Sequence, residues 1–158
     1  MLFRSISNDE LIKRTNIVGR RIPVSVNNIT GFPTETRELA FDTIRLNRQL
    51  QVDTMNCYTF MPYHGTPLRE RAVHLGLLDP NAVTCSLTAG SILKMPQYPL
   101  QEIRGITKCF SLYARLPESL WPAIHRAEQD DDEGQETFAQ LREQYVAKYF
   151  NDGKITFS

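Results

Sequence analysis

The sequence predicts an α/β fold with parallel strands joined by a helix, followed by a mostly helical C-terminal part. Two segments, Ile22–Thr30 and Asp53–Met61, are rich in β-branched and aromatic residues, which is typical of strands. Each segment runs into a turn containing glycine and proline, and an amphipathic stretch of helical length separates the two. Because a helical crossover joins them, we expect the strands to be parallel neighbours.

A short helix is expected before the first strand. Ser7 to Glu10 has the pattern of a capping box, in which the Ser7 hydroxyl accepts from the Glu10 backbone N–H and the Glu10 carboxylate reaches back. Gly19 suits the end of this helix. Its apolar stripe consists of Leu11, Ile12, Ile17 and Val18.

The helix between the two strands is predicted over Thr36–Leu50. Thr34 or Thr36 can cap its amino end, where Glu35 and Glu38 interact favourably with the helix dipole. Four apolar residues fall roughly on one side of it, namely Leu39, Ala40, Ile44 and Leu50.

The remaining chain is predicted to be helical in four places. A short helix over Leu68–Leu75 ends at Gly76, and residues 77–99 are loop-like because they contain Pro80, Gly90, Pro96 and Pro99. Three later helices are expected over Pro99–Pro117, Leu120–Glu128 and Gln135–Phe150, with an exposed acidic break at Gln129–Gly134. The chain therefore divides into an α/β part, residues 1–78, and a mostly helical extension, residues 79–158.

Composition favours an ordinary globular protein. The 158 residues are 41% hydrophobic and 23% charged, and the formal net charge is zero, so nothing points to nucleic acid as a partner. No apolar run approaches the ~20 residues of a membrane helix, and the amino end lacks the pattern of a signal peptide. We therefore expect a cytoplasmic protein that binds neither nucleic acid nor membranes.

The three cysteines, Cys57, Cys85 and Cys109, are an odd number and widely spaced. A disulfide framework is not expected, and no pair has the spacing of a zinc knuckle or a redox motif. Cys57 lies within a predicted strand and Cys109 within a predicted helix, which is typical of small buried residues. Cys85 lies in a predicted loop.

Two segments, Asn28–Thr36 and Asn56–Leu68, resemble at this spacing the C-terminal half of a radical S-adenosylmethionine (radical SAM) enzyme. The likeness is greatest to members that carry a cobalamin-binding domain. It implies that the two strands are the fifth and sixth, and last, strands of a partial (βα) barrel, a fragment of the TIM-barrel type. It also implies that Leu2–Arg4 leaves the fourth strand, so that Met1 falls within the barrel. The parent family uses S-adenosylmethionine and an iron–sulfur cluster, [4Fe–4S], with cobalamin in some members.

The resemblance also assigns roles to individual residues. It implies that S-adenosylmethionine contacts come from Asn28, Ile29, Gly31, Pro33, Glu35, Met61 and Pro62. Ile29 would lie against the adenine, while Glu35 or backbone groups would fix the turn. Tyr63 and His64 would lie in a loop on the substrate side. The alternative interpretation is a tight turn with a helix-capping Glu35 and a merely solvated His64.

The family's cluster is held by three cysteines in a Cys-x3-Cys-x2-Cys loop, and this sequence has no such loop. No catalytic residue and no metal ligand is therefore assigned. The first hypothesis is a fragment of a radical SAM enzyme, inactive alone, whose partner is the missing N-terminal half, in the same gene or a separate chain. The alternative is a non-catalytic half-barrel that acts as a binding or adaptor protein. A small hydrolase is disfavoured, because no Ser or Cys with His and a carboxylate forms a recognisable arrangement.

Overall fold

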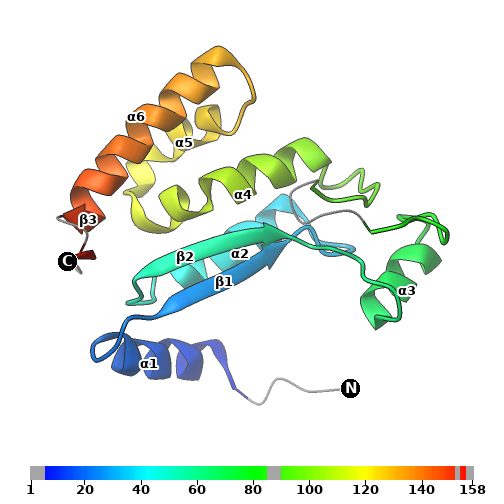
Figure 1. Ribbon diagram of the computed structural model, residues 1–158, viewed down its shortest axis with the longest axis horizontal. Helices are drawn as coiled ribbons and strands as arrows, with labels where there is room; N and C mark the ends of the chain where they lie inside the picture. The colour runs from blue at the N-terminus through cyan, green and yellow to red at the C-terminus, as the bar shows by residue number, and fades with distance from the viewer. Residues whose placement is uncertain (1–5, 85–89, 152–153, 156–158) are drawn as a thin grey trace.

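The computed structural model describes residues 6–84, 90–151 and 154–155 (Figure 1). Its elements follow in the order α1 (Asn8–Gly19), β1 (Ser25–Thr30), α2 (Arg37–Asn47), β2 (Thr54–Thr59), α3 (Pro67–His74), α4 (Leu100–Arg115), the short 3₁₀ helix η2 (Glu118–Leu120), α5 (Trp121–Ala127), α6 (Asp132–Tyr149), β3 (Phe150–Asn151) and β4 (Lys154–Ile155). The described part is thus α/β, as the sequence predicts.

The strands β1 and β2 form a parallel pair with α2 as the crossover, which confirms that prediction. The register runs from Ser25 opposite Thr54 to Thr30 opposite Thr59. Both strands are shorter than expected. Before β1, the backbone N–H groups of Arg21 and Ile22 donate to the Val18 carbonyl, so these residues close α1 and do not extend the strand.

Side-chain caps set the helix starts. Ser7 caps α1 as predicted, since its hydroxyl accepts from the Glu10 N–H at 3.2 Å. The Glu10 carboxylate was predicted to reach back to the start of the helix, but it accepts a hydrogen bond from Arg14 Nε at 2.6 Å instead. Thr36, and not Thr34, caps α2 by accepting from the Leu39 N–H.

The helix α2 buries a narrower face than the sequence pattern suggests. Ala40 and Ile44 are buried, and Leu50 is buried just beyond the helix end. Leu39 is half exposed, so its expected place on the buried side was wrong. A polar residue, Asn47, occupies the buried face instead, because its side chain exchanges hydrogen bonds with Asn28 on β1.

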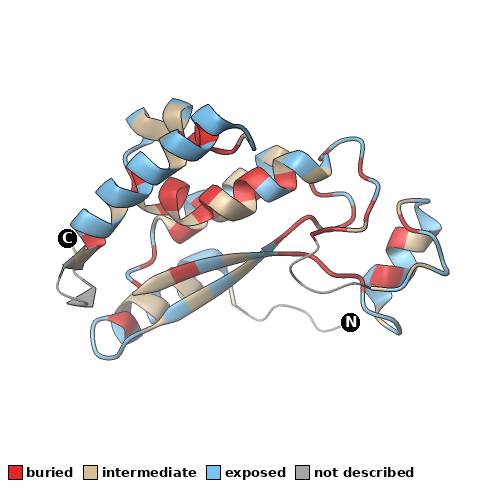
Figure 2. Ribbon diagram, turned by 45° about the horizontal axis from the view of Figure 1, so that its top comes forward, coloured by how far each residue is buried: buried red, intermediate tan, exposed pale blue. Residues whose placement is uncertain are grey.

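The helix α4 joins the C-terminal extension to the sheet. It packs against β2 and α2, and it runs along β2 on the side away from β1 (Figures 1 and 2). Its inward residues Ile103, Ile106, Phe110 and Tyr113 are all buried, as predicted from their spacing. Arg48 from the end of α2 fixes its last turn by donating to the carbonyls of Tyr113 and Leu116.

The helices α5 and α6 pack against each other and against α4. The predicted exposed break at Gln129–Gly134 is wrong in its second half, because α6 already begins at Asp132. Asp131 is the N-cap and accepts from the Gly134 N–H at 2.8 Å, so the acidic run starts a helix. The antiparallel pair β3–β4 was not predicted.

In the described ranges, no helix is both long enough and apolar enough to cross a membrane.

Candidate functional site: the open sheet face and its cavity

One face of the two-stranded sheet is left open. Residues on alternate positions of β1 and β2 share this face, and they pair across the strands as Ser25–Thr54, Asn27–Asn56 and Ile29–Tyr58. The first two pairs are hydrogen-bonded, from Thr54 Oγ1 to Ser25 Oγ at 2.7 Å and from Asn56 Nδ2 to Asn27 Oδ1 at 3.0 Å. The third pair is apolar, and each side chain is 47% exposed. The open face is therefore polar at its start and apolar at the carboxyl ends of the strands.

A cavity of about 500 Å³ lies at these carboxyl ends, within the ~300–1,000 Å³ range of small-ligand sites. It is lined by residues of both strands, of the turns that follow them and of the start of α3: Asn27, Ile29, Phe32, Tyr58, Thr59, Phe60, Met61, Tyr63, Thr66 and Leu68. The Phe32 and Phe60 rings contact each other with centroids 5.0 Å apart and join the two turns. The lining is mainly apolar and aromatic, with a few polar groups.

The Gly31–Thr36 turn after β1 is held by the Glu35 carboxylate. One of its oxygens accepts from the backbone N–H groups of Gly31 and Phe32 and from the Thr30 hydroxyl. Glu35 is only 9% exposed, and this burial raises the pKa of its carboxyl above the ordinary value of 4.5. The sequence hypothesis that Glu35 fixes the turn agrees with this geometry.

The same turn contains an unusual backbone conformation. Thr34 has φ of 74°, in the left-handed region that a β-branched residue rarely adopts. The strain is held in place by the Glu35 carboxylate on one side and by the chain before α4 on the other, where Gln97 Nε2 donates to the Glu35 carbonyl. The turn is thus a rigid, locally strained edge of the cavity.

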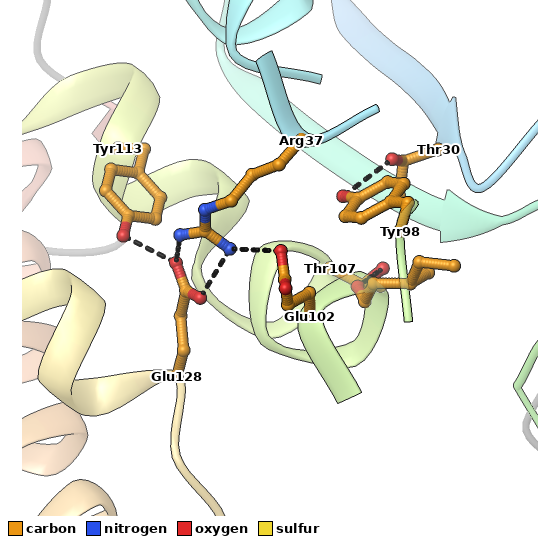
Figure 3. A network of polar contacts seen from close by, with 8 residues as sticks. Thr30, Arg37, Tyr98, Glu102, Thr107, Tyr113 and Glu128 are labelled. Carbon is orange, nitrogen blue, oxygen red and sulfur yellow. Dashed lines mark hydrogen bonds and ion pairs between the residues drawn. The ribbon is translucent and has the colours of Figure 1, made fainter. Parts of the chain in front are cut away.

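Tyr98 reinforces the turn from the C-terminal extension. Its side chain is fully buried, and its hydroxyl lies 3.2 Å from the Thr30 hydroxyl (Figure 3). Burial raises the pKa of Tyr98 well above its usual range, so the hydroxyl keeps its proton. The segment between α3 and α4 is therefore part of the support of the site.

A second buried network lies next to this support (Figure 3). Arg37, the first residue of α2, forms a bidentate pair with Glu128 after α5, with N–O distances of 2.9 and 2.7 Å. Tyr113 of α4 donates to the same carboxylate at 2.5 Å. Gly105 lets Glu128 approach, since a Cβ there would lie 2.7 Å from the Glu128 Cβ. The network joins α2, α4 and α5 directly behind the turn.

Of the predicted site residues, the structure brings Ile29, Met61 and Tyr63 together in the cavity lining. Asn28 points to the opposite face, where it bonds to Asn47. Gly31 has φ of 87°, and a Cβ there would lie 3.3 Å from Ile103, so its role is close packing against α4.

The other predicted residues do not line the cavity. Glu35 lies behind the turn, Pro33 is within the turn, Pro62 is buried and His64 is exposed.

Sequence reasoning missed several lining residues, above all Asn27 and Tyr58. Strand alternation could have found them, because the residues that share a face with Ile29 are its neighbours two positions away and its cross-strand partner. Phe32 and Thr66 come from turns, and Leu68 comes from the first turn of α3. The directions of these side chains follow from the tertiary fold and not from the period of a strand.

The loop after β2 is anchored by a buried arginine. Arg69 of α3 is 5% exposed and donates to the carbonyls of Pro62, Pro80 and Ala82 at 2.7–3.0 Å. Thr66 caps the same helix. These bonds fix Tyr63 and Thr66 at the cavity mouth.

The two described cysteines do not fit an iron–sulfur cluster. Cys57 is partly buried in β2 and Cys109 fully buried in α4, and burial raises the pKa of each thiol to about 12. Cluster ligands are thiolates held in a short loop. Within the described ranges, no group of three or more His, Cys, Asp or Glu could hold a metal ion. Cys85 and Leu2–Arg4 lie outside the described residues.

A second cavity, of about 460 Å³, lies between α4 and the α5–α6 turn. It is lined by Leu100, Gln101, Arg104, Lys108, Glu128 and Asp130. Charges of both signs face it, and Lys108 is engaged with the Ala127 carbonyl and the Phe138 ring.

Comparisons with known proteins found no matching family model, no matching curated protein and no matching solved structure.

Proposed function

We propose that this chain is the C-terminal part of a radical SAM barrel and that the cavity at the ends of β1 and β2 binds the adenosine part of S-adenosylmethionine. The observation that carries the proposal is the position of the cavity. In α/β proteins with parallel strands, ligands bind at the carboxyl ends of the strands, and the cavity with its rigid turn lies there.

The two edges of the sheet support a barrel in which β2 is the last strand. At one edge, α4 runs along β2 on the side away from β1. At the other edge, β1 has no further strand partner among the described residues. An open face lined by hydrogen-bonded polar pairs suits a barrel interior.

The lining residues suggest how an adenosine would be held. Ile29 and Tyr58 offer an apolar and aromatic surface for the flat base, and Tyr63 offers a second ring. The N–H groups of Gly31 and Phe32 are occupied by Glu35, so polar contacts to the ligand would come from Asn27 or Thr66. In radical SAM enzymes the bound S-adenosylmethionine supplies a 5′-deoxyadenosyl radical or a methyl group. The chain's own contribution would be to bind and orient the adenosine and to exclude water around it.

A second candidate is a half-barrel that binds a protein or small molecule without catalysis. The cavity lining favours it, since the described residues that line the cavity include no His, Cys, Asp, Glu, Lys or Arg. The two candidates predict different results in one measurement. The radical SAM barrel should bind adenosine ligands more tightly than guanosine ligands, whereas the non-catalytic half-barrel need not.

Calorimetry with S-adenosylmethionine, 5′-deoxyadenosine, 5′-deoxyguanosine and methionine tests the proposal. We expect the two adenosine ligands to bind with dissociation constants on the order of 1 mM, because few contacts are available, and the other two to bind more weakly. Ile29→Ala should weaken adenosine binding about fivefold, which is the effect of losing part of one apolar contact.

The matched control is Leu39→Ala, because Leu39 is similarly exposed, 50% against 47%, but lies on α2 outside the cavity. Equal binding of adenosine and guanosine ligands, or equal binding by the wild-type chain and Ile29→Ala, would reject the adenosine site.

A further inference from the structure

The helix α6 carries a groove of about 670 Å³ along its outer side. The described residues that line it all belong to this helix and are spaced by three and four positions, which places them on one side: Phe138, Ala139, Arg142, Glu143, Val146 and Ala147. The helix lies at the margin of the molecule, with α4 between it and the sheet (Figure 1). Most of its outer side is exposed (Figure 2).

This α6 groove is apolar at both ends and charged in the middle. Ala139, Val146 and Ala147 are exposed there. Arg142 and Glu143 are also exposed, and within the described part of the chain neither side chain takes part in a hydrogen bond or an ion pair. A cation and an anion without partners therefore lie side by side between two apolar patches.

The lining of the α6 groove is complementary to itself. When the helix is reversed about the midpoint between Arg142 and Glu143, every lining position falls on another lining position. The resulting pairs are Phe138 with Ala147, Ala139 with Val146, and Arg142 with Glu143. In each apolar pair a larger side chain meets an alanine, and in the third pair a cation meets an anion. A two-fold axis through this midpoint would bring two antiparallel copies of α6 together in this register.

We propose that two copies of this chain form a dimer through the α6 groove, with their α6 helices antiparallel. Each Arg142 would pair with Glu143 of the other copy, so the dimer contains two ion pairs at its centre. Ala139 and Ala147 leave room for the larger side chains of the other copy. A second copy is the occupant that the lining itself specifies, because it supplies the same residues in reverse order.

The dimer does not rest on the proposed function, because the α6 groove shares no lining residue with the cavity at the ends of β1 and β2. One helix from each copy makes a small interface, and interfaces at the low end of the size range are weak. We therefore expect a dissociation constant on the order of 0.1 mM. Sedimentation velocity of the full chain, from about 10 µM to 1 mM, should show a monomer–dimer equilibrium.

Charge reversal tests the central pairs. Arg142→Glu should weaken the dimer about tenfold, because two ion pairs are replaced by two pairs of like charge. Glu143→Arg should do the same. An equimolar mixture of the two variants should dimerise about as tightly as the wild-type chain, because two carboxylates of one copy then face two guanidinium groups of the other.

The matched control is Lys13→Glu, which makes the same change of charge at an exposed position of α1 outside the groove. It should dimerise as the wild-type chain does. Ala147→Glu tests the apolar pairs, since it places a carboxylate against Phe138 of the other copy, and it should also weaken the dimer about tenfold. Circular dichroism checks that each variant keeps its helices, as expected for substitutions at exposed positions.

Three results would overturn the proposal. The first is a wild-type chain that stays monomeric at 1 mM, a concentration well above the expected dissociation constant. The second is a dimer that Arg142→Glu, Glu143→Arg and Ala147→Glu leave unchanged, which would place the interface elsewhere. The third is a mixture of the two charge-reversed variants that dimerises no more tightly than either variant alone.

Discussion

Thr34 shows how one residue departs from the local rules at the cavity edge. Its left-handed backbone is disfavoured for a β-branched residue, yet the Glu35 carboxylate and the Gln97 side chain hold the turn in place around it. The sequence marks this turn through Gly31 and Pro33, but it does not show which residue carries the strain.

Replacing Thr34 with glycine should stabilise the protein. The left-handed conformation costs roughly 1–2 kcal/mol for an ordinary residue, and glycine loses about 0.5–1 kcal/mol through its flexible unfolded state. We therefore expect Thr34→Gly to raise the free energy of unfolding by about 0.5–1 kcal/mol in urea denaturation. Thr43→Gly, in the middle of α2, is the control and should lower it by about 0.5 kcal/mol. A loss of stability in Thr34→Gly would show that the threonine side chain makes a necessary contact.

Glu35 should make stability depend on pH in a specific direction. Its pKa is raised by burial, so the folded state binds the proton more tightly than the unfolded state does. The stability of the wild-type chain relative to Glu35→Gln should thus be greatest below pH 4.5 and should decrease as pH rises through the folded-state pKa.

Urea denaturation of both proteins over this range measures the difference. Glu35→Ala should be less stable than either, by about 3 kcal/mol, because it leaves the Gly31 and Phe32 N–H groups unpaired. A wild-type chain that gains stability relative to Glu35→Gln with rising pH would contradict the assigned shift.

At the scale of elements, sequence patterns predict the strands and most helices, because period and capping residues are local. The ends of elements depend on contacts that are distant in sequence. The acidic run Gln129–Gly134 predicts an exposed break between helices. In the structure, Asp131 caps α6, and Arg126 pairs with Asp131 and Glu133. Leu39 follows the helical period of the buried face, yet the hydrogen bonds between Asn28 and Asn47 set the side of α2 that faces the sheet.

The pair of Arg37 and Glu128 should hold α2 and α5 together. Arg37→Met leaves a carboxylate whose side chain is 3% exposed without its cation, so we expect a loss of about 3 kcal/mol in urea denaturation. Adding Glu128→Gln should recover most of this loss, because no buried charge then remains unpaired.

The exposed pair of Arg45 and Asp42 serves as the comparison for this result. Its side chains are 56% and 67% exposed, and Arg45→Met should change stability by no more than about 0.5 kcal/mol. Similar losses in Arg37→Met and Arg45→Met would show that the buried network does not hold the helices together.

At the scale of the whole molecule, the sequence predicts the parallel pair and its crossover, and the proposed barrel extends this arrangement beyond the described chain. The residues that line the cavity were harder to predict. The alternation of β1 and β2 places Ile29 with Tyr58, but the contributions of Phe32, Thr66 and Leu68 depend on how α4 and the Arg69 anchor fold the turns.

The isolated chain should not assemble an iron–sulfur cluster. Its cysteines lie in a strand, in a helix and, for Cys85, outside the described residues, and the two described thiols are buried. After anaerobic treatment with iron and sulfide we expect no cluster absorbance and no 5′-deoxyadenosine from S-adenosylmethionine under strong reductant. Cleavage of the cofactor by the isolated chain would contradict the proposal that it contributes only part of a radical SAM site.

The most direct test of the adenosine site is an NMR titration of the isotope-labelled chain with 5′-deoxyadenosine. We expect the largest shifts on the backbone amides of Ile29, Phe32 and Tyr58, which line the cavity at the strand ends. Shifts confined to Gln101, Arg104 and Lys108, at the second cavity between α4 and the α5–α6 turn, would contradict the proposed site.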